Sequence, residues 1–162
     1  MAEQNRPNVI VFFTDQQRWD STGAHGNPLE LTPNFDRIAQ QGTHLYNCVT
    51  PQPVCGPARA CFQTGQYAST HGGMWNGNAK VPDSSPRLAE CFKQAGYRTG
   101  YIGKWHLGDQ RGGPVSKDWR GGYEDWLASN ILEFTSDAYG TKVWDGEDNE
   151  HRLPGYRVDA LT

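Results

Sequence analysis

The stretch PVCGPARACFQTGQY, residues 53–67, predicts a loop that leads into a helix. Pro57 has a φ fixed near the helical value and suits the first helical position, while Gly65 can end the helix. Cys55 then lies at the helix mouth, where unpaired N–H groups and the positive dipole end favour an anion. Arg59, one turn further on, adds a fixed cation. A cysteine in such a field is a candidate nucleophile, and a small buried cysteine beside an ordinary helix start is the alternative.

Composition restricts the class of protein. The 162 residues suffice for one domain, so we expect residues 1–162 to contain no second domain. The net charge is −3 without a basic block, which argues against a nucleic acid partner. The chain has 19 glycines and 10 prolines and is 36% hydrophobic. These values favour a loop-rich α/β chain over a helix bundle.

Targeting signals and cysteine pairs are not evident in the sequence. No apolar run approaches the ~18 residues of a membrane span, so we expect no membrane partner. The N-terminus lacks a basic region followed by a long apolar core, which predicts no signal peptide and a cytoplasmic protein. In that compartment the four cysteines, Cys48, Cys55, Cys61 and Cys91, are expected to be thiols.

A continuous apolar run, NVIVFFT at residues 8–14, predicts a strand buried on both faces of a parallel sheet. Asp15 and Gln16 follow it directly. Ligands collect beyond the carboxyl ends of strands in open α/β sheets, so both residues are candidate oxygen ligands for a hard metal ion. The alternative is that Asp15 caps a turn or helix.

The next segments predict a helix, a strand and a second helix. Thr32 and Pro33 can open a helix that Gly42 ends, and residues 43–50, THLYNCVT, alternate as a strand that would lead towards Cys55. Ser85 and Pro86 predict the start of the second helix, which should end at Gly96.

A third predicted strand, YRTGYIG at residues 97–103, continues into Lys104 and His106. Residues two apart on an extended chain point to the same side, so this pair could face one site as a point cation and a proton carrier. The alternative is ordinary surface charge. Further on, residues 144–151, WDGEDNEH, predict an acidic turn.

Four blocks in this order resemble one family. They are PNVIVFFTDQQ (7–17), TPNFDRIAQQG (32–42), CGPARACFQTG (55–65) and GYRTGYIGKWHLG (96–108). The chain resembles the N-terminal part of a formylglycine-type sulfatase of the alkaline phosphatase superfamily. The resemblance implies an α/β, alkaline-phosphatase-like sandwich with a mostly parallel central sheet flanked by helices, truncated on its C-terminal side.

The resemblance also implies a chemistry centred on Cys55. A formylglycine-generating enzyme would recognise Pro57 and Arg59 and oxidise Cys55 to an aldehyde, whose hydrate carries two hydroxyls. One hydroxyl would attack the sulfur of a small-molecule or glycan sulfate ester. Loss of a proton from the other would then release sulfate and restore the aldehyde.

The same resemblance assigns roles to the remaining candidates. Asp15, Gln16 and the residue formed from Cys55 would hold a divalent metal, Ca²⁺ first, with Mg²⁺ or Mn²⁺ as alternatives. Arg59 would anchor the modified side chain. Lys104 would bridge it to the sulfate, and His106 would handle protons at the aldehyde hydrate.

Two departures from the family pattern leave alternatives open. Many members have a second aspartate where this chain has Gln16, and the Asp-Gln pair also occurs in relatives that cleave phosphonate monoesters or phosphodiesters. Family members are also much longer, and their later half supplies further metal and sulfate ligands. We therefore expect a fragment that is inactive in isolation, and a non-catalytic binding fragment is the third alternative.

Overall fold

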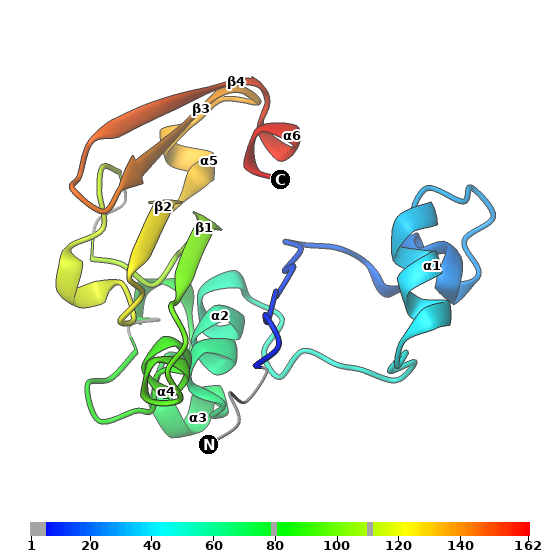
Figure 1. The fold of residues 1–162 in the computed structure, drawn as a ribbon, viewed down its shortest axis with the longest axis horizontal. Coiled ribbons are helices and arrows are strands. Elements are labelled where there is room, and N and C mark those ends of the chain that lie inside the picture. The colour runs from blue at the N-terminus through cyan, green and yellow to red at the C-terminus, as the bar shows by residue number, and fades with distance from the viewer. Residues whose placement is uncertain (1–5, 79–80, 110–111) are drawn as a thin grey trace. The chain divides into compact units, whose positions relative to one another are not determined.

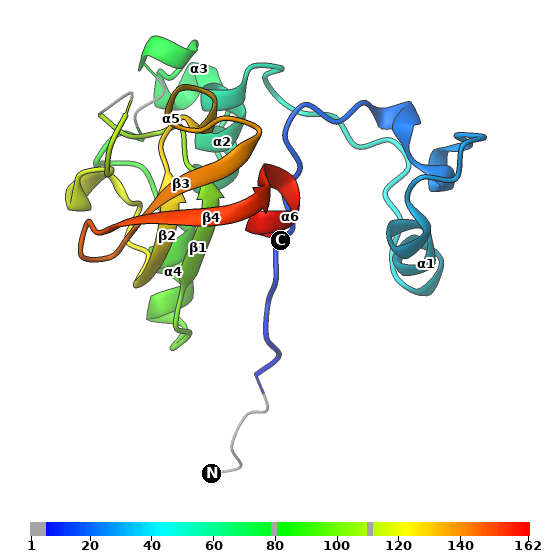
Figure 2. The same cartoon turned by 90° about the horizontal axis from the view of Figure 1, so that it is seen from above.

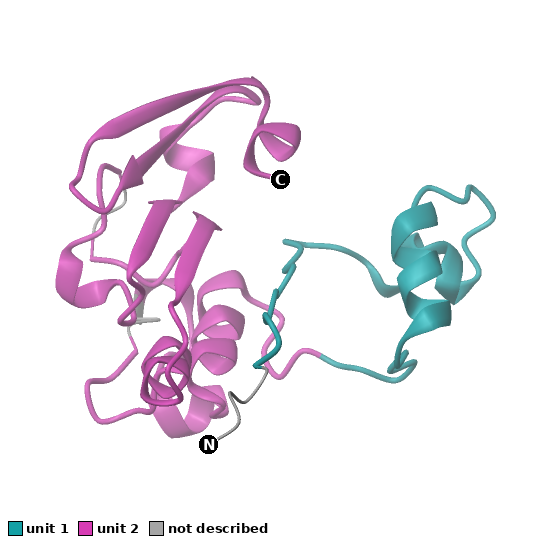
Figure 3. Cartoon of the chain, in the orientation of Figure 1, with its two compact units in different colours: residues 1–49 teal, residues 50–162 magenta. Residues whose placement is uncertain are grey.

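The computed structural model describes residues 6–78, 81–109 and 112–162. The chain divides into two compact units, residues 1–49 and 50–162, which Figure 3 distinguishes by colour. Each unit is described below by itself.

Within residues 6–49, the described part of the first unit, there is one α-helix, α1, at Pro33–Gln41. Short 3-10 turns at Trp19–Ser21 and Gly23–His25 precede it. The prediction for this helix is confirmed, with Thr32 as N-cap and Gly42 as C-cap. A carboxylate oxygen of Asp36 accepts the backbone N–H of Ala24 at 2.7 Å. This bond ties the preceding turn to the first turn of α1.

The predicted strands at residues 8–14 and 43–50 are not formed, and these two predictions were wrong. Both segments lack strand structure, and the side chains of Ile10 and Phe12 are 89% and 74% exposed. A β-strand forms only when its backbone N–H and C=O groups hydrogen-bond to those of an adjacent strand. The hydrophobic pattern of a segment does not by itself provide that adjacent strand. Neither Asp15 nor Cys55 is therefore delivered by a strand in the described part of the chain.

The second unit begins with helix α2, at Cys55–Thr64, so the prediction of a loop leading into a helix is confirmed. The helix begins at Cys55 and not at Pro57, because the Val54 carbonyl already accepts the N–H of Ala58 at 2.9 Å. Pro57 remains within the first turn, where a missing N–H costs nothing. Gly65 ends the helix with a φ of 67°, which glycine adopts easily.

The other helices of this unit are short. The helix predicted at Ser85 and Pro86 begins later, because Arg87 is still extended. The helices are α3 (Ala68–His71), α4 (Leu88–Gln94), α5 (Leu132–Thr135) and α6 (Arg157–Leu161).

A four-stranded sheet has the order β1-β2-β3-β4. Its strands are β1 (Gly100–Lys104), β2 (Asp125–Ser129), β3 (Tyr139–Asp145) and β4 (Glu150–Tyr156). The pair β1/β2 is parallel, and the other two pairs are antiparallel. Figures 1 and 2 show β3 and β4 as a long hairpin with α6 at its end. The mixed α/β class is confirmed, as are the predicted strand before Lys104 and the acidic turn between β3 and β4.

The core of this unit forms where α2 packs on one face of β1 and β2. Ala60 of α2 belongs to one buried cluster with Trp126 and Ala128, which alternate along β2. Trp105, just after β1, is 1% exposed and completes the contact. Among the described residues, none of the helices is both long and apolar enough to cross a membrane.

The buried side chain of Arg120 connects the loop that contains Val115 to the β3–β4 turn. Its guanidinium donates to the carbonyls of Val115 and Gly146, at 2.8 and 3.0 Å, and pairs with Asp148. It also lies 5.3 Å from the centre of the Trp126 ring. Only 6% of the side chain is exposed. If Arg120 were removed, water could therefore not easily take its place as the hydrogen-bond donor to these oxygen atoms.

We expect Arg120→Ala to lower the free energy of unfolding by about 3 kcal/mol, because two carbonyls and a carboxylate lose their donor. Urea denaturation measures the change. Arg152→Ala removes an arginine that is 69% exposed and pairs with Glu150, so it should stay within about 0.5 kcal/mol of the parent. Equal effects of the two substitutions would contradict the role of Arg120.

The β3–β4 turn contains a carboxylate with an unusually low pKa. Asp145 accepts from His151 at 2.8 Å and from the Asn149 side chain and backbone, and these bonds hold its pKa well below the ordinary 3.8. A carboxylate whose pKa falls on folding stabilises the fold above its unfolded-state pKa, and loses that effect as pH falls through the folded value.

We expect His151→Ala to raise the pKa of Asp145 towards its ordinary value, because the largest cause of the shift is removed. An NMR titration of the carboxyl carbon gives the pKa directly. His44→Ala, in the other unit, provides a matched histidine substitution that should leave the pKa of Asp145 unchanged.

Candidate functional site

Asn76 holds the N-terminus of α2, where Cys55 lies. Its side-chain oxygen accepts the N–H of Gly56 at 2.9 Å, and its amide atoms lie 3.5 and 3.6 Å from the Cys55 sulfur. Val54 is the N-cap residue, and its side chain makes no hydrogen bond to the N–H groups of the first turn. A distant asparagine thus replaces the missing cap and contacts the candidate nucleophile at the same time.

Arg59 joins α2 to the end of β1. One guanidinium nitrogen donates to the backbone carbonyl of Lys104 and lies 3.3 Å from the Tyr101 hydroxyl. That hydroxyl donates to the same Lys104 carbonyl. Arg59 is buried, so its charge is placed in the protein interior one turn away from Cys55.

The parallel pairing of β1 and β2 continues past the end of β1. The N–H groups of Trp105 and His106 donate to the carbonyls of Ser129 and Asn130, at 2.9 and 2.7 Å. The Asn130 side chain also accepts the N–H of Gly108 at 2.9 Å. A Cβ at Gly108 would lie 2.9 Å from that same oxygen, which explains glycine at this position.

His106 itself has a φ of 58°, in the left-handed region that non-glycine residues rarely adopt. The extended geometry from which we expected Lys104 and His106 to share a side therefore ends at Trp105. Both side chains are nevertheless buried. The backbone bonds to β2 fix the position of the His106 backbone.

Lys104 forms an ion pair that the sequence does not predict. Its ammonium lies 2.5 Å from a carboxylate oxygen of Glu133, in α5. The lysine is therefore not ordinary surface charge. Its position at the end of β1 and its burial agree with an anion-directed role, and Glu133 is the counter-ion within the chain.

Asp15 and Gln16 belong to the first unit, so the structure does not test them together with Cys55. Gln16 has a φ of 53°, a strained conformation that is enriched at functional sites. Their carboxylate and amide oxygens suit a hard divalent cation. Within residues 6–78, 81–109 and 112–162, no three or more His, Cys, Asp or Glu side chains form a group that could hold a metal.

His71, the last residue of α3, is buried next to Cys61. It is 4% exposed, and its Nε2 lies 3.4 Å from the Cys61 sulfur. Burial raises the pKa of the Cys61 thiol and lowers the pKa of His71, so both groups are neutral near pH 7. All four cysteines are free of disulfides, and Cys61 and His71 form a buried hydrogen-bonding contact.

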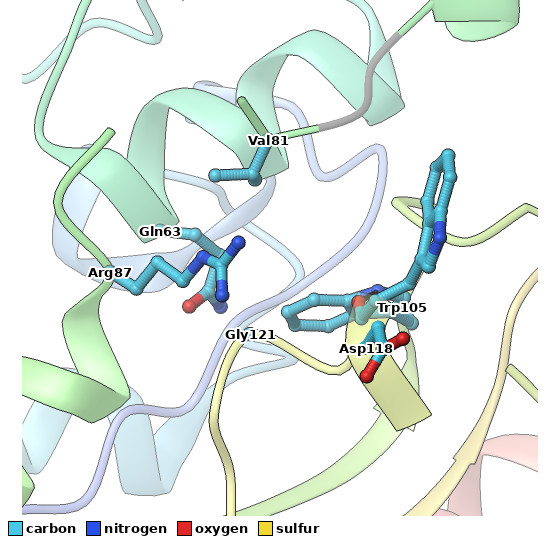
Figure 4. A pocket seen from close by; sticks show the side chains of 7 residues that line it. Gln63, Val81, Arg87, Trp105, Asp118 and Gly121 are labelled. Carbon is cyan, nitrogen blue, oxygen red and sulfur yellow. Dashed lines mark hydrogen bonds between the residues drawn. The ribbon is translucent and has the colours of Figure 1, made fainter. Parts of the chain in front are cut away.

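A small, partly open pocket lies beside α2. Figure 4 shows Gln63, Val81, Arg87 and Trp105 among the side chains that line it. Its volume is about 20 Å³, which has room for a water molecule but not for a sulfated sugar. None of Cys55, Arg59, Lys104 and His106 lines this pocket, so it is separate from the candidate site.

In this α/β fold a cysteine lies at a helix N-terminus. A buried arginine joins that helix to the strand end that carries a buried lysine. The sulfatase family profile matches residues 7–154. The chain belongs to the sulfatase family.

Similar proteins support this assignment. The chain is 36% identical over 154 residues to an ulvan-active sulfatase of Formosa agariphila, covering 94% of this chain and 29% of that protein. It is 33% identical over 161 residues to an N-acetylglucosamine-6-O-sulfatase of Bacteroides thetaiotaomicron, covering 99% and 27%. The chain thus spans less than a third of the length of these relatives.

A solved structure has the same fold. It is a complex of a protein with its substrate D-glucosamine-2-N,6-O-disulfate, and it superposes with a TM-score of 0.75 at 30% identity. The match covers 95% of this chain and 29% of that one. The predicted alkaline-phosphatase-like fold is therefore confirmed.

We expect Asn76→Ala to lower the free energy of unfolding by about 1 kcal/mol, because the N–H of Gly56 loses its acceptor. Hydrogen exchange of the Gly56 amide should become faster. Asn76→Asp keeps an acceptor oxygen and should retain most of the stability and protection. Unchanged exchange at Gly56 in Asn76→Ala would exclude the capping role.

Proposed function

We propose that residues 1–162 form the N-terminal part of the catalytic domain of a sulfuric ester hydrolase. Its nucleophile would be a formylglycine derived from Cys55. The observation that carries the proposal is the placement of Cys55 at the N-terminus of α2, with Arg59 bonded to the carbonyl of Lys104. Membership of the sulfatase family gives this geometry its reaction class.

The side chains of the second unit would bind and polarise the ester. Arg59, already fixed by the Lys104 carbonyl and Tyr101, would orient the modified Cys55 side chain. Lys104 would donate to sulfate oxygens and stabilise charge that develops during sulfur transfer. His106 would accept and return the proton of the hydrate hydroxyl, as a histidine does near neutral pH.

The family implies a divalent cation, and the donor chemistry of this chain agrees with one. Asp15 and Gln16 offer hard oxygen atoms that suit Ca²⁺, with Mg²⁺ or Mn²⁺ as alternatives. A thiol is a poor ligand for these ions, so Cys55 would qualify only after conversion to an oxygen-bearing residue. When bound, the cation would supply positive charge that polarises the ester. Calcium takes about six to eight oxygen ligands, so the site requires further donors.

We propose a sulfated saccharide as the substrate class, supported by the names of the relatives. An N-acetylglucosamine-6-O-sulfatase and the solved complex with a disulfated glucosamine are both among the matches. A phosphonate monoester or phosphodiester is the second candidate, favoured by Gln16 beside Asp15. Turnover of a sulfate ester against a phosphonate ester by the full-length protein distinguishes the two.

The first test is the mass of the Cys55 peptide from protein expressed in a host that contains a formylglycine-generating enzyme. We expect a loss of about 18 Da, because CH₂–SH is replaced by an aldehyde in a reactive-cysteine oxidation. The peptides of Cys48 and Cys91, both exposed thiols, serve as internal controls and should keep their mass.

Turnover completes this test. In the full-length protein, Cys55→Ala should abolish hydrolysis of a sulfate ester, because no nucleophile forms. An unmodified Cys55 in a competent host would instead favour the non-catalytic binding protein. Hydrolysis by the isolated 162-residue chain would contradict its proposed status as an incomplete domain.

A further inference from the structure

The ion pair between Lys104 and Glu133 is asymmetric in its exposure. The Lys104 side chain is 8% exposed, whereas that of Glu133 is 49% exposed. A buried ammonium requires an anionic partner, whereas a half-exposed carboxylate can be hydrated by itself. Glu133 is therefore the partner that can move away when another anion reaches Lys104.

Strand pairing places Glu133 at this position. Lys104 is the last residue of β1 and is in register with Ser129, the last residue of β2. Glu133 follows four residues later, in the single turn of α5. Both charged residues thus lie at the carboxyl edge of the parallel pair, the edge at which open α/β sheets bind ligands.

The charge of Glu133 affects different esters to different extents. A sulfate ester carries one negative charge, whereas a phosphate monoester carries two at pH 8 because its second pKa is about 6. Either can replace the carboxylate on Lys104. Glu133 stays on the adjoining helix, and at the same distance its charge repels a dianion twice as strongly as a monoanion.

We propose that Glu133 is a specificity-determining residue that restricts the Lys104 anion site to monoanionic esters. The inference rests on the proposed function, which assigns Lys104 to the ester group. It adds one property of the substrate, namely its charge. Sulfate monoesters, phosphodiesters and phosphonate monoesters each carry one negative charge and are accepted. Phosphate monoester dianions bind less tightly, because Glu133 repels their second charge.

The experiment measures the binding of methyl sulfate and methyl phosphate at pH 8 to the full-length protein with Cys55 unmodified, by calorimetry. In Glu133→Gln, the affinity for methyl phosphate should rise about tenfold more than that for methyl sulfate, because the second charge is no longer repelled. Glu133→Ala removes the same charge and is measured alongside. Glu133→Asp keeps the charge and should keep the preference for methyl sulfate.

The matched control is Glu147→Gln, which makes the same change in net charge at an exposed residue paired with Lys117. It should leave the preference unchanged. Lys104→Met should abolish binding of both esters.

Three results would overturn the proposal. The first is an equal gain in affinity for both esters in Glu133→Gln. The second is that Glu147→Gln changes the two affinities in the same way as Glu133→Gln. The third is that neither Glu133→Gln nor Glu133→Ala binds either ester measurably. The measurement needs no turnover and no modified cysteine. Failure of the proposed function would instead be seen as an unmodified Cys55 in a competent host.

Discussion

The bond from the Arg59 guanidinium to the Lys104 carbonyl is the constraint on which the second unit depends. It joins the first turn of α2 to the last residue of β1, so the helix that begins with Cys55 and the strand that ends with Lys104 cannot shift independently. Tyr101 donates to the same carbonyl and packs against Trp105 and Trp126. The aromatic core therefore helps to fix the position of Cys55, the candidate nucleophile, through Tyr101, the Lys104 carbonyl and Arg59.

Buried cations recur in this unit, and their partners differ according to their function. Arg120 donates mainly to backbone carbonyls of loops, which are fixed neutral acceptors, and its role is structural. Lys104 is held by a side chain, Glu133, that is itself half exposed. A cation bonded to backbone carbonyls has acceptors that cannot move away by side-chain rotation, whereas one paired with a half-exposed carboxylate can exchange that partner for a ligand.

The sequence predicts the local features and misses the distant ones. Helices α1 and α2 follow from proline and glycine positions, and β1 follows from a short run that contains Tyr, Thr and Ile, because these signals act within a few residues. The strand at residues 8–14 fails because a ladder partner is a tertiary property. Asn76 and Glu133 are not predicted for the same reason, since each contacts a residue 20 or more positions away.

The exposed run at residues 9–13, VIVFF, has a consequence for the behaviour of the chain in solution. It joins β-branched and aromatic side chains without charge, proline or glycine, and it forms no ladder in the described part of the chain. Such a segment is a template for cross-β stacking between molecules. The chain in isolation therefore has an intrinsic route to aggregation, and solubilising mutations belong at this segment and not in the folded second unit.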